Sequence, residues 1–359
     1  RTRATGGLGS PTDEEGKPIH PVTRQFMGLH RLQAEQAANG EASAELTRAL
    51  KAIGRAGRTL DKVADSQGRA TEIAVRVLSG DSELRSGLTA MRNGLAQLDS
   101  RARQNLFDQA ILEAWETILQ TAQQRLEEQW RRKVYRPYQR DLKGRYPFAV
   151  SSQDVSLADF ERFFHPQNGR VELFEKKELS PFLEEGGRQS RTWEGRGLQL
   201  SSSVKQFLAD AEQIGTHLFS GGSLQVRFEL VPELPKEQGE APAASQVYIR
   251  IHGTSQTYQM GYQPTTTFVW PGDRGARIVL NTRAGSLPPK QKPGVWAWFR
   301  LLDDASVDPR SSNEYWLRWV FEKGDQYSIV PRYTLRSEKP QRLFSDPMGF
   351  FHLTVPKRL

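Results

Sequence analysis

Residues 204–230 read VKQFLADAEQIGTHLFSGGSLQVRFEL, and the spacing of the apolar residues changes within this stretch. Over residues 204–218 they recur every three or four positions, which is typical of an amphipathic helix. Gly221 and Gly222 follow and are suited to ending that helix. Over residues 224–230 apolar and polar residues alternate, which is typical of a strand with one buried face. The stretch predicts helices before residue 222 and strands after it.

The chain before this stretch shows helical spacing in several places. The strongest apolar stripe predicts one continuous helix, and Pro137 is expected to end or kink it near Arg136. About 35 residues at ~1.5 Å each give roughly 50 Å, and an amphipathic helix of that length must pack against others. We therefore predict a loop or linker over 1–20, a helical bundle with a long pillar helix over 21–143, and a second helical segment over 144–222. The stripe consists of Ile111, Trp115, Ile118, Ala122, Leu126, Trp130 and Val134.

Alternation of apolar and polar residues continues after residue 223. One short helix is expected within the strand series, at residues 295–302. Short strands with frequent turns favour an antiparallel β-sandwich-like domain over 223–359, and the whole chain is assigned to the α+β class. The predicted strands are 224–230, 247–251, 256–260, 266–270, 277–281, 313–321, 326–336 and 349–355.

Composition excludes several classes of protein. The 359 residues contain no Cys, which excludes a disulfide framework, a thiolate metal site and a Cys nucleophile. The longest apolar runs, 295–302 and 350–355, fall far short of the ~20 residues needed to cross a bilayer. The chain opens without Met and without the apolar core of a signal peptide, so we expect it to be part of a longer protein.

Motifs for catalysis, metals and cofactors are not found. The nearest approach to a phosphate-binding loop, Gly9 to Gly16-Lys17, has the wrong spacing and is followed by Pro18. The six His residues do not form pairs at helical spacing, as a zinc site would need. No G-x-S-x-G sequence presents a Ser nucleophile. We expect no catalytic residues, no metal site and no cofactor.

Adjacent carboxylates occur at three places: Glu127-Glu128, Glu184-Glu185 and Asp303-Asp304. Neighbouring residues on a helix point in different directions, so these pairs are interpreted as surface groups. A fold can nevertheless bring carboxylates together, as in glycosidases. A periplasmic module that binds or hydrolyses cell-wall glycan therefore remains the alternative function.

The net charge of +8 is modest, and its densest basic run spans residues 131–145. Trp130, Tyr135 and Tyr138 lie in or beside this run and could in principle stack on bases. A solvated basic helix end is the favoured interpretation, because cations are stabilised at a helix C-terminus. We expect no nucleic-acid partner and no small-molecule substrate.

The aromatic residues are more informative about function than the polar residues. Residues 316–321, WLRWVF, are apolar on both faces of a strand, which indicates either burial within the chain or coverage by a partner. Four further aromatics lie in or beside predicted strands and include outward-facing candidates, and Tyr and Trp are favoured anchors at protein interfaces. The predicted partner-binding residues are Tyr248, Tyr258, Tyr262 and Trp270.

Several phrases, in order along the chain, resemble the C-terminal periplasmic region of the IcmF family, whose members are also called TssM. The resemblance runs over nearly the whole chain, from about His20 to Leu359. The phrases are 144–148 (GRYPF), 154–160 (DVSLADF), Phe163-Phe164, 179–182 (LSPF), 226–230 (VRFEL), 268–272 (FVWPG), 298–303 (WFRLLD) and Gly349-Phe350.

The resemblance implies a structural subunit of the bacterial type VI secretion membrane complex, placed in the periplasm and anchored in the inner membrane outside this fragment. Family members bind the outer-membrane lipoprotein TssJ through the C-terminal β-domain, and TssM copies associate into the envelope channel. The resemblance also implies that TssL binds parts of family members that lie outside this fragment. The expected function is therefore that of a scaffold and not of an enzyme.

Overall fold

The computed structural model describes residues 51, 54–55, 57–59, 67–94 and 108–359, except residue 238. The predicted loop over 1–20 and nearly all of the helices predicted over 21–66 lie outside the described residues. The described chain forms two compact units. Unit 1 contains the residues up to Arg131, residues 176–201 and residues 358–359. Unit 2 contains residues 132–175 and 202–357.

Unit 1 is built mainly from three helices. Helix α4 buries Ala70, Ala74 and Val77 completely, and it packs along α7, whose Trp115 is also fully buried. The ring of Trp193 meets that of Trp115 edge-on, with 5.7 Å between ring centroids. The elements are α4 (Gln67–Ser79), α5 (Glu83–Gly94), α7 (Gln109–Trp130), η4 (Ser180–Phe182), β1 (Thr192–Trp193) and β2 (Arg196–Gly197).

The predicted pillar helix is present but interrupted. Helix α7 has 22 residues, which corresponds to ~33 Å. A π-helical segment, η2 (Arg131–Tyr135), separates it from α8 (Arg136–Asp141). Pro137 stands in the first turn of α8, and the residues before it are helical too, so its missing N–H removes one helical hydrogen bond at this point. The change of helix type at residues 131–135 therefore lies close to Arg136, where the sequence predicts an end or a kink.

Unit 2 has helices first and then mainly strands, with short helices among and after them, so the predicted α+β class is confirmed. In α9 the side chain of Ser156 accepts a hydrogen bond from the backbone N–H of Asp159 at 3.1 Å, which fixes the start of the helix. Phe160, Phe163 and Phe164 form its buried face. After α8 the helices are α9 (Leu157–Phe164), α10 (Arg170–Phe174) and α11 (Ser202–Leu218), and the π-helical η3 (Glu175–Leu179) lies at the unit boundary.

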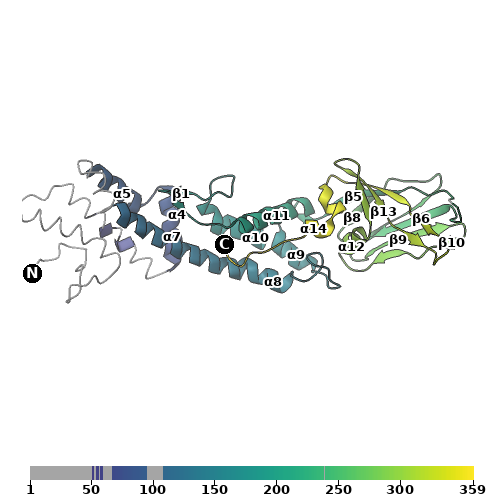
Figure 1. The fold of residues 1–359 in the computed structure, drawn as a ribbon, viewed down its shortest axis with the longest axis horizontal. Helices are drawn as coiled ribbons and strands as arrows, with labels where there is room; N and C mark the ends of the chain where they lie inside the picture. The colour runs from purple at the N-terminus through teal and green to yellow at the C-terminus, as the bar shows by residue number, and fades with distance from the viewer. Residues whose placement is uncertain (1–50, 52–53, 56, 60–66, 95–107, 238) are drawn as a thin grey trace, which may run out of the picture. The chain divides into compact units, whose positions relative to one another are not determined.

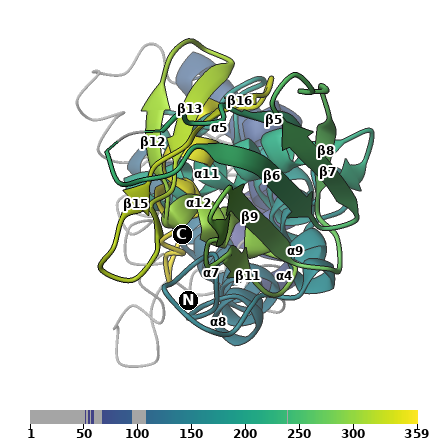
Figure 2. The same ribbon diagram turned by 90° about the vertical axis from the view of Figure 1, so that its right-hand side faces the viewer.

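The strands of unit 2 form two antiparallel five-stranded sheets, which face each other as layers (Figure 2). The β5 sheet has the order β12 (Ser306–Pro309), β13 (Glu314–Arg318), β16 (Arg332–Arg336), β5 (Val226–Pro232), β8 (Thr267–Trp270). The β6 sheet has the order β10 (Gly285–Ser286), β9 (Ala276–Thr282), β6 (Ala244–Ile251), β7 (Thr254–Gln259), and β11 (Lys290–Lys292) also pairs with β9. Two small hairpins are β3 (Phe219–Ser220) with β4 (Ser223–Leu224), and β14 (Phe321–Glu322) with β15 (Ser328–Ile329).

Large aromatic side chains fill the space between the two sheets. The predicted short helix is present as α12 (Ala297–Asp303), and its Trp298 stacks on Phe228 of β5 with 4.5 Å between ring centroids. Trp270 is fully buried and donates from its indole N–H to the carbonyl of Val295 at 2.7 Å. Because the indole N–H has an acceptor, this Trp is buried without loss of a hydrogen bond.

Within unit 2, α12 lies at the end of the sandwich nearest to α9 (Figure 1), and residues at α12 contact the segment that precedes α9. Trp296 donates from its indole N–H to the carbonyl of Val155 at 2.8 Å. Arg300 pairs with Asp154 at 2.5 Å and lies over the ring of Tyr146, 3.9 Å from its centroid. The strands and the neighbouring helices of unit 2 are therefore joined by buried indoles and a half-buried ion pair.

The strand predicted over 349–355 is wrong. Residues 341–345 form α13 (Gln341–Ser345), and a second short helix, α14 (Pro347–Phe350), follows. The Asp346 side chain accepts from the backbone N–H of Gly349 at 2.9 Å and caps α14, and Pro347 occupies its first turn. This Asp-Pro start signal outweighs the alternating apolar residues that follow it. None of the helices within the described ranges is long and apolar enough to cross a membrane.

Candidate functional site

Two of the four predicted partner-binding residues are core residues. Tyr258 on β7 and Trp270 on β8 are both fully buried. The Tyr258 hydroxyl donates to the carbonyl of Leu230 at 2.8 Å, across the interior of the sandwich. The expectation that these two side chains face outward is therefore wrong, because both fill the space between the sheets.

The other two predicted residues lie at the surface. Tyr248 stands on the outer side of β6 and is half-buried. Tyr262 is 55% exposed and closes the tight turn that follows β7, where Gln259 and Tyr262 exchange two backbone hydrogen bonds of 3.0 and 2.9 Å. Met260 in the same turn is 69% exposed, and Gly261 has a φ of +82°, which favours glycine. The turn presents two large apolar side chains to solvent.

Strand parity would have separated the buried Trp270 from the outward Tyr248. On β8, Trp270 has the same parity as Phe268, and both are buried. On β6, Tyr248 lies between the buried Val247 and Ile249 and so faces the other way. The alternation within each strand can be read from the sequence. The exposure of Met260 could not be predicted in this way, because it depends on a turn that only the fold defines.

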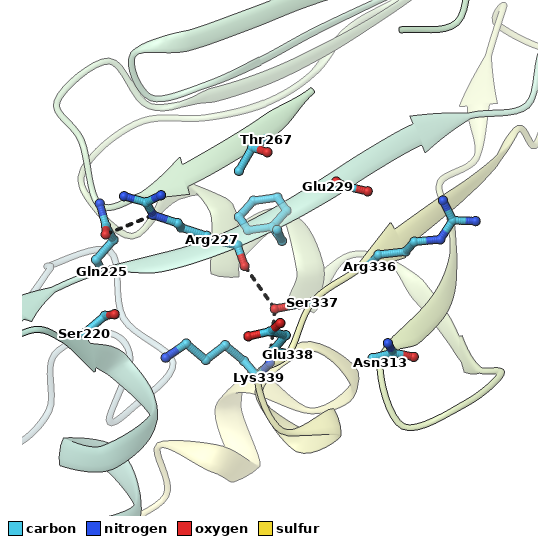
Figure 3. Close-up of a pocket in the computed structure, with 11 residues that line it drawn as sticks. Ser220, Gln225, Arg227, Glu229, Thr267, Asn313, Arg336, Ser337, Glu338 and Lys339 are labelled. Atoms are coloured by element: carbon cyan, nitrogen blue, oxygen red, sulfur yellow. Dashed lines mark hydrogen bonds between the residues drawn. The ribbon is translucent and has the colours of Figure 1, made fainter. Parts of the chain in front are cut away.

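A polar groove lies at the end of the β5 sheet that is nearest to β3 and β4 (Figure 3). Its volume is about 500 Å³. The segment that follows β16 forms one wall, and Ser337 in it donates to the carbonyl of Arg227 at 3.0 Å. The groove is lined by Ser220, Gln225, Arg227, Phe228, Glu229, Thr267, Asn313, Arg336, Ser337, Glu338 and Lys339. The sequence patterns did not predict this groove, because its lining residues come from six separate segments.

The groove contains hydrogen-bonding and charged groups but no pair of groups arranged for acid–base or nucleophilic chemistry. The Arg227 guanidinium donates to the Gln225 amide oxygen at 3.0 Å, and Arg336 donates to Glu314 at 2.9 Å. Burial lowers the pKa of Lys339, and the negative charge of Glu338 opposes this effect. The lining residues include neither His nor Cys. The groove can hold a polar segment of a partner by hydrogen bonds and charge.

The three pairs of adjacent carboxylates do not converge on a shared site. Asp303 accepts a hydrogen bond from the Tyr146 hydroxyl at 2.6 Å, and its neighbour Asp304 pairs with Lys292 at 2.7 Å. Burial raises the pKa of Asp303 and also that of Tyr146. Glu127 pairs with Arg131 at the start of η2, and Glu128 pairs with Arg125 of its own helix. Glu184 and Glu185 are exposed.

The basic run over 131–145 also has local partners. Arg140 pairs with Asp141 at 2.6 Å, and a guanidinium N–H of Arg145 donates to the Asp141 carbonyl at 3.1 Å. Trp130 and Tyr138 are buried, so neither ring is available to stack on a base. In the part of the chain that the structure describes, no group of three or more His, Cys, Asp or Glu side chains could hold a metal ion.

Two family models match neighbouring stretches of the chain. The type VI secretion protein IcmF helical domain matches residues 121–224, and the IcmF C2-like domain matches residues 228–331. A curated relative, the type VI secretion system component TssM1 of Pseudomonas aeruginosa strain PAO1, is 28% identical over 248 residues. The alignment covers 66% of this chain and 22% of the relative, so the chain spans about a fifth of that protein's length.

Solved structures resemble the fold. A chain of a type VI secretion system membrane core complex has a TM-score of 0.71 at 24% identity, with 95% of this chain and 71% of that chain covered. The TssM C-terminal domain from EAEC has a TM-score of 0.56 at 25% identity, with 66% of this chain and 98% of that domain covered. The two domain matches together account for more than half of the chain, in the order that the fold shows. The chain belongs to the IcmF (TssM) family of type VI secretion proteins and carries the family's helical and C2-like domains.

Proposed function

We propose that the chain is a structural subunit of a type VI secretion membrane core complex and acts in the periplasm. In this role its β-domain binds the outer-membrane lipoprotein TssJ, and copies of the chain associate with one another around the secretion channel. The family membership and the similarity to a chain of a membrane core complex support this role. TssL is expected to bind other parts of the protein. We propose no enzymatic activity, cofactor or nucleic-acid partner.

The observation that carries the proposal is the exposed turn over 259–262. Met260 and Tyr262 are large apolar side chains exposed within one turn, and a contiguous exposed apolar patch is a candidate interaction surface. Tyrosine gives a large, amphipathic contact at low cost in side-chain entropy. The turn is also rigid, since two backbone hydrogen bonds close it. A rigid apolar turn at the end of a sandwich is suited to insertion into a partner.

Binding of the 359-residue chain to soluble TssJ, measured by calorimetry, tests the proposal. We expect micromolar or tighter binding, weakened at least about 10-fold by Met260→Ser combined with Tyr262→Ser. Val320→Ser with Val330→Ser is the matched control, because both valines are exposed apolar residues elsewhere on the domain. Self-association is measured separately by light scattering. A chain that neither binds TssJ nor associates with itself would refute the proposed function.

A further inference from the structure

The outer face of the β6 sheet has an unusual distribution of charge. Along β6 the buried residues alternate with outward ones, and along β9 they do the same. The alternation places Tyr248 and Arg250 of β6 on the outer face, together with Arg277 and Val279 of β9. All four side chains are half-buried. Both arginines therefore hold their guanidinium groups close to the sheet.

The two arginines stand directly opposite each other. Arg250 is the cross-strand partner of Arg277, and the same row continues to Ser255 on β7 and Gln291 on β11. Directly opposed residues on one face have Cβ atoms about 5 Å apart, and like charges at that spacing destabilise a sheet. The row therefore consists of two cations flanked by two neutral polar side chains, an arrangement that the fold alone does not favour.

No carboxylate of the described chain compensates this pair. Neither Arg250 nor Arg277 has an ion-pair partner within 4.0 Å among the described residues. The Nε atoms of both are buried and lack an acceptor. Arg250 makes a weak hydrogen bond from Nη2 to the carbonyl of Arg274 at 3.5 Å. Buried donors without acceptors are costly, and this cost is removed if a partner supplies oxygen atoms.

The outer face of the β5 sheet shows that the same domain can neutralise its arginines. There Arg336 pairs with Glu314 at 2.9 Å, and Arg332 pairs with Glu233. On that same face Arg227 and Arg318 also lack a carboxylate within 4.0 Å among the described residues, and Arg318 stands opposite Arg332. In that opposed pair Arg332 has Glu233 as its partner, whereas in the pair Arg250–Arg277 neither arginine has a carboxylate.

We propose that this arginine face, defined by Arg250, Arg277 and the neighbouring Tyr248, is where the lipoprotein docks, and that the lipoprotein supplies carboxylates to the two guanidiniums. The proposal rests on the proposed function and adds the surface and the chemistry of its partner. Arginine binds carboxylates through two parallel hydrogen bonds, and Arg with Tyr is typical of the centre of an interface. Tyr248 and Val279, in the next row, add an apolar strip that a protein surface would cover. In the following row, Gln246 of β6 stands opposite Gln259 of β7. Gln259 begins the exposed turn that carries Met260 and Tyr262.

Charge reversal tests the surface directly. Arg250→Glu with Arg277→Glu should weaken binding of the full chain to soluble TssJ by roughly 30-fold or more, and wild-type affinity should fall steeply with added salt. The matched control, Arg318→Glu with Arg332→Glu, changes a second directly opposed arginine pair, on the outer face of the β5 sheet, makes the same change of net charge, and should change affinity less than about 3-fold. If the Arg250/Arg277 variant binds like wild type, the surface proposal is wrong and the proposed function stands. If the wild-type chain does not bind TssJ, the surface proposal is wrong, and the proposed function is refuted as well if the chain also fails to associate with itself.

A stability measurement distinguishes a binding role from a structural one. If the pair is uncompensated in the free protein, Arg250→Gln and Arg277→Gln should each raise the melting temperature or leave it unchanged. Added salt should reduce the difference in melting temperature between each variant and wild type, because salt screens the repulsion between the two arginines. A melting temperature lowered by several degrees in both variants would show that the arginines serve the fold, and would overturn the proposal.

Discussion

Acidification should destabilise unit 2 through one buried histidine. His252 lies in the turn between β6 and β7, is 1% exposed, and has a φ of +52°. Its backbone N–H donates to the carbonyl of Gly275 at 2.7 Å, whereas neither ring nitrogen has a hydrogen-bond partner. Burial lowers the pKa of His252 to about 4, and the nearby backbone of Gly272 and the charge of Asp273 oppose this effect more weakly. The ring is therefore neutral in the folded protein at pH 7.

The size of the effect follows from the two pKa values. Unfolding returns the His252 pKa from about 4 to its ordinary value of 6.5, so the unfolded chain binds the proton more tightly. The stability that depends on the neutral ring is complete above pH 6.5 and is lost as the pH falls toward 4. Between about pH 7.5 and about pH 4.5 the free energy of unfolding should fall by roughly 2.5 kcal/mol from this residue alone.

Urea unfolding followed by tryptophan fluorescence, at several pH values, measures this loss. His252→Asn is the informative variant, because asparagine tolerates a positive φ and does not titrate in this range. Between about pH 7.5 and about pH 4.5, the free energy of unfolding of this variant should fall by roughly 2.5 kcal/mol less than that of wild type. His352→Asn, at an exposed position, is the control and should keep the wild-type slope. A His252 ring pKa above about 6 by NMR, or equal slopes for wild type and His252→Asn, would refute the reasoning.

Three further changes test the packing of unit 2. Gly294→Ala should lower the free energy of unfolding by about 1–3 kcal/mol, because Gly294 has a φ of +85° and an added Cβ would collide with the Asp154 carboxylate; equal urea midpoints would contradict this. A double-mutant cycle of Arg300→Gln and Asp154→Asn should give a coupling energy of about 1 kcal/mol or more, since the pair is only about one-fifth exposed; a coupling near zero would mean that solvent screens it. Tyr333→Phe should stabilise the fold by up to ~1 kcal/mol, because the hydroxyl is buried without a partner; a lower melting temperature would reveal an acceptor such as a bound water.

The order of helices and strands could be predicted because it depends on local periodicity. The change from helical to strand spacing near Gly221 and Gly222 coincides with the end of α11 and the start of the strands. Helix α12 was predicted to within two residues, since its flanking Pro and Gly residues mark it clearly. The error at 349–355 has a local cause too, because the apolar alternation was weighed above the helix-start signal at Asp346 and Pro347.

The arginine face could not be predicted in the same way. Arg250 and Arg277 are 27 positions apart and become neighbours only through the register of β6 with β9. Register depends on which faces are buried and on the turns between strands, and a shift of β9 by one residue would turn Arg277 to the interior, away from Arg250. The groove could not be predicted from the sequence either, because its lining residues come from segments that meet only in the folded domain.

The two outer faces of the sandwich differ in a way that bears on partner binding. The sequence left open whether the apolar residues at 316–321 are covered by the chain itself or by a partner. In the structure Trp316 points outward on β13 and lies between the guanidiniums of Arg310 and Arg332, which are 3.9 and 4.0 Å from the centroids of its rings. Cation–π contacts of this kind cover an exposed indole on both sides, and Asp308 and Glu233 balance the two arginines.

On the β5 sheet, Trp316, Arg310 and Arg332 are therefore already in contact with one another and with carboxylates. A partner that bound there would have to displace contacts already made, at a cost that weakens binding. The outer face of the β6 sheet has no such contacts to displace, since its central arginines lack carboxylates and its Tyr248 lacks a covering cation among the described residues. This comparison supports the proposed docking on the outer face of the β6 sheet over docking on the β5 sheet, even though the β5 sheet carries the aromatic sequence 316–321.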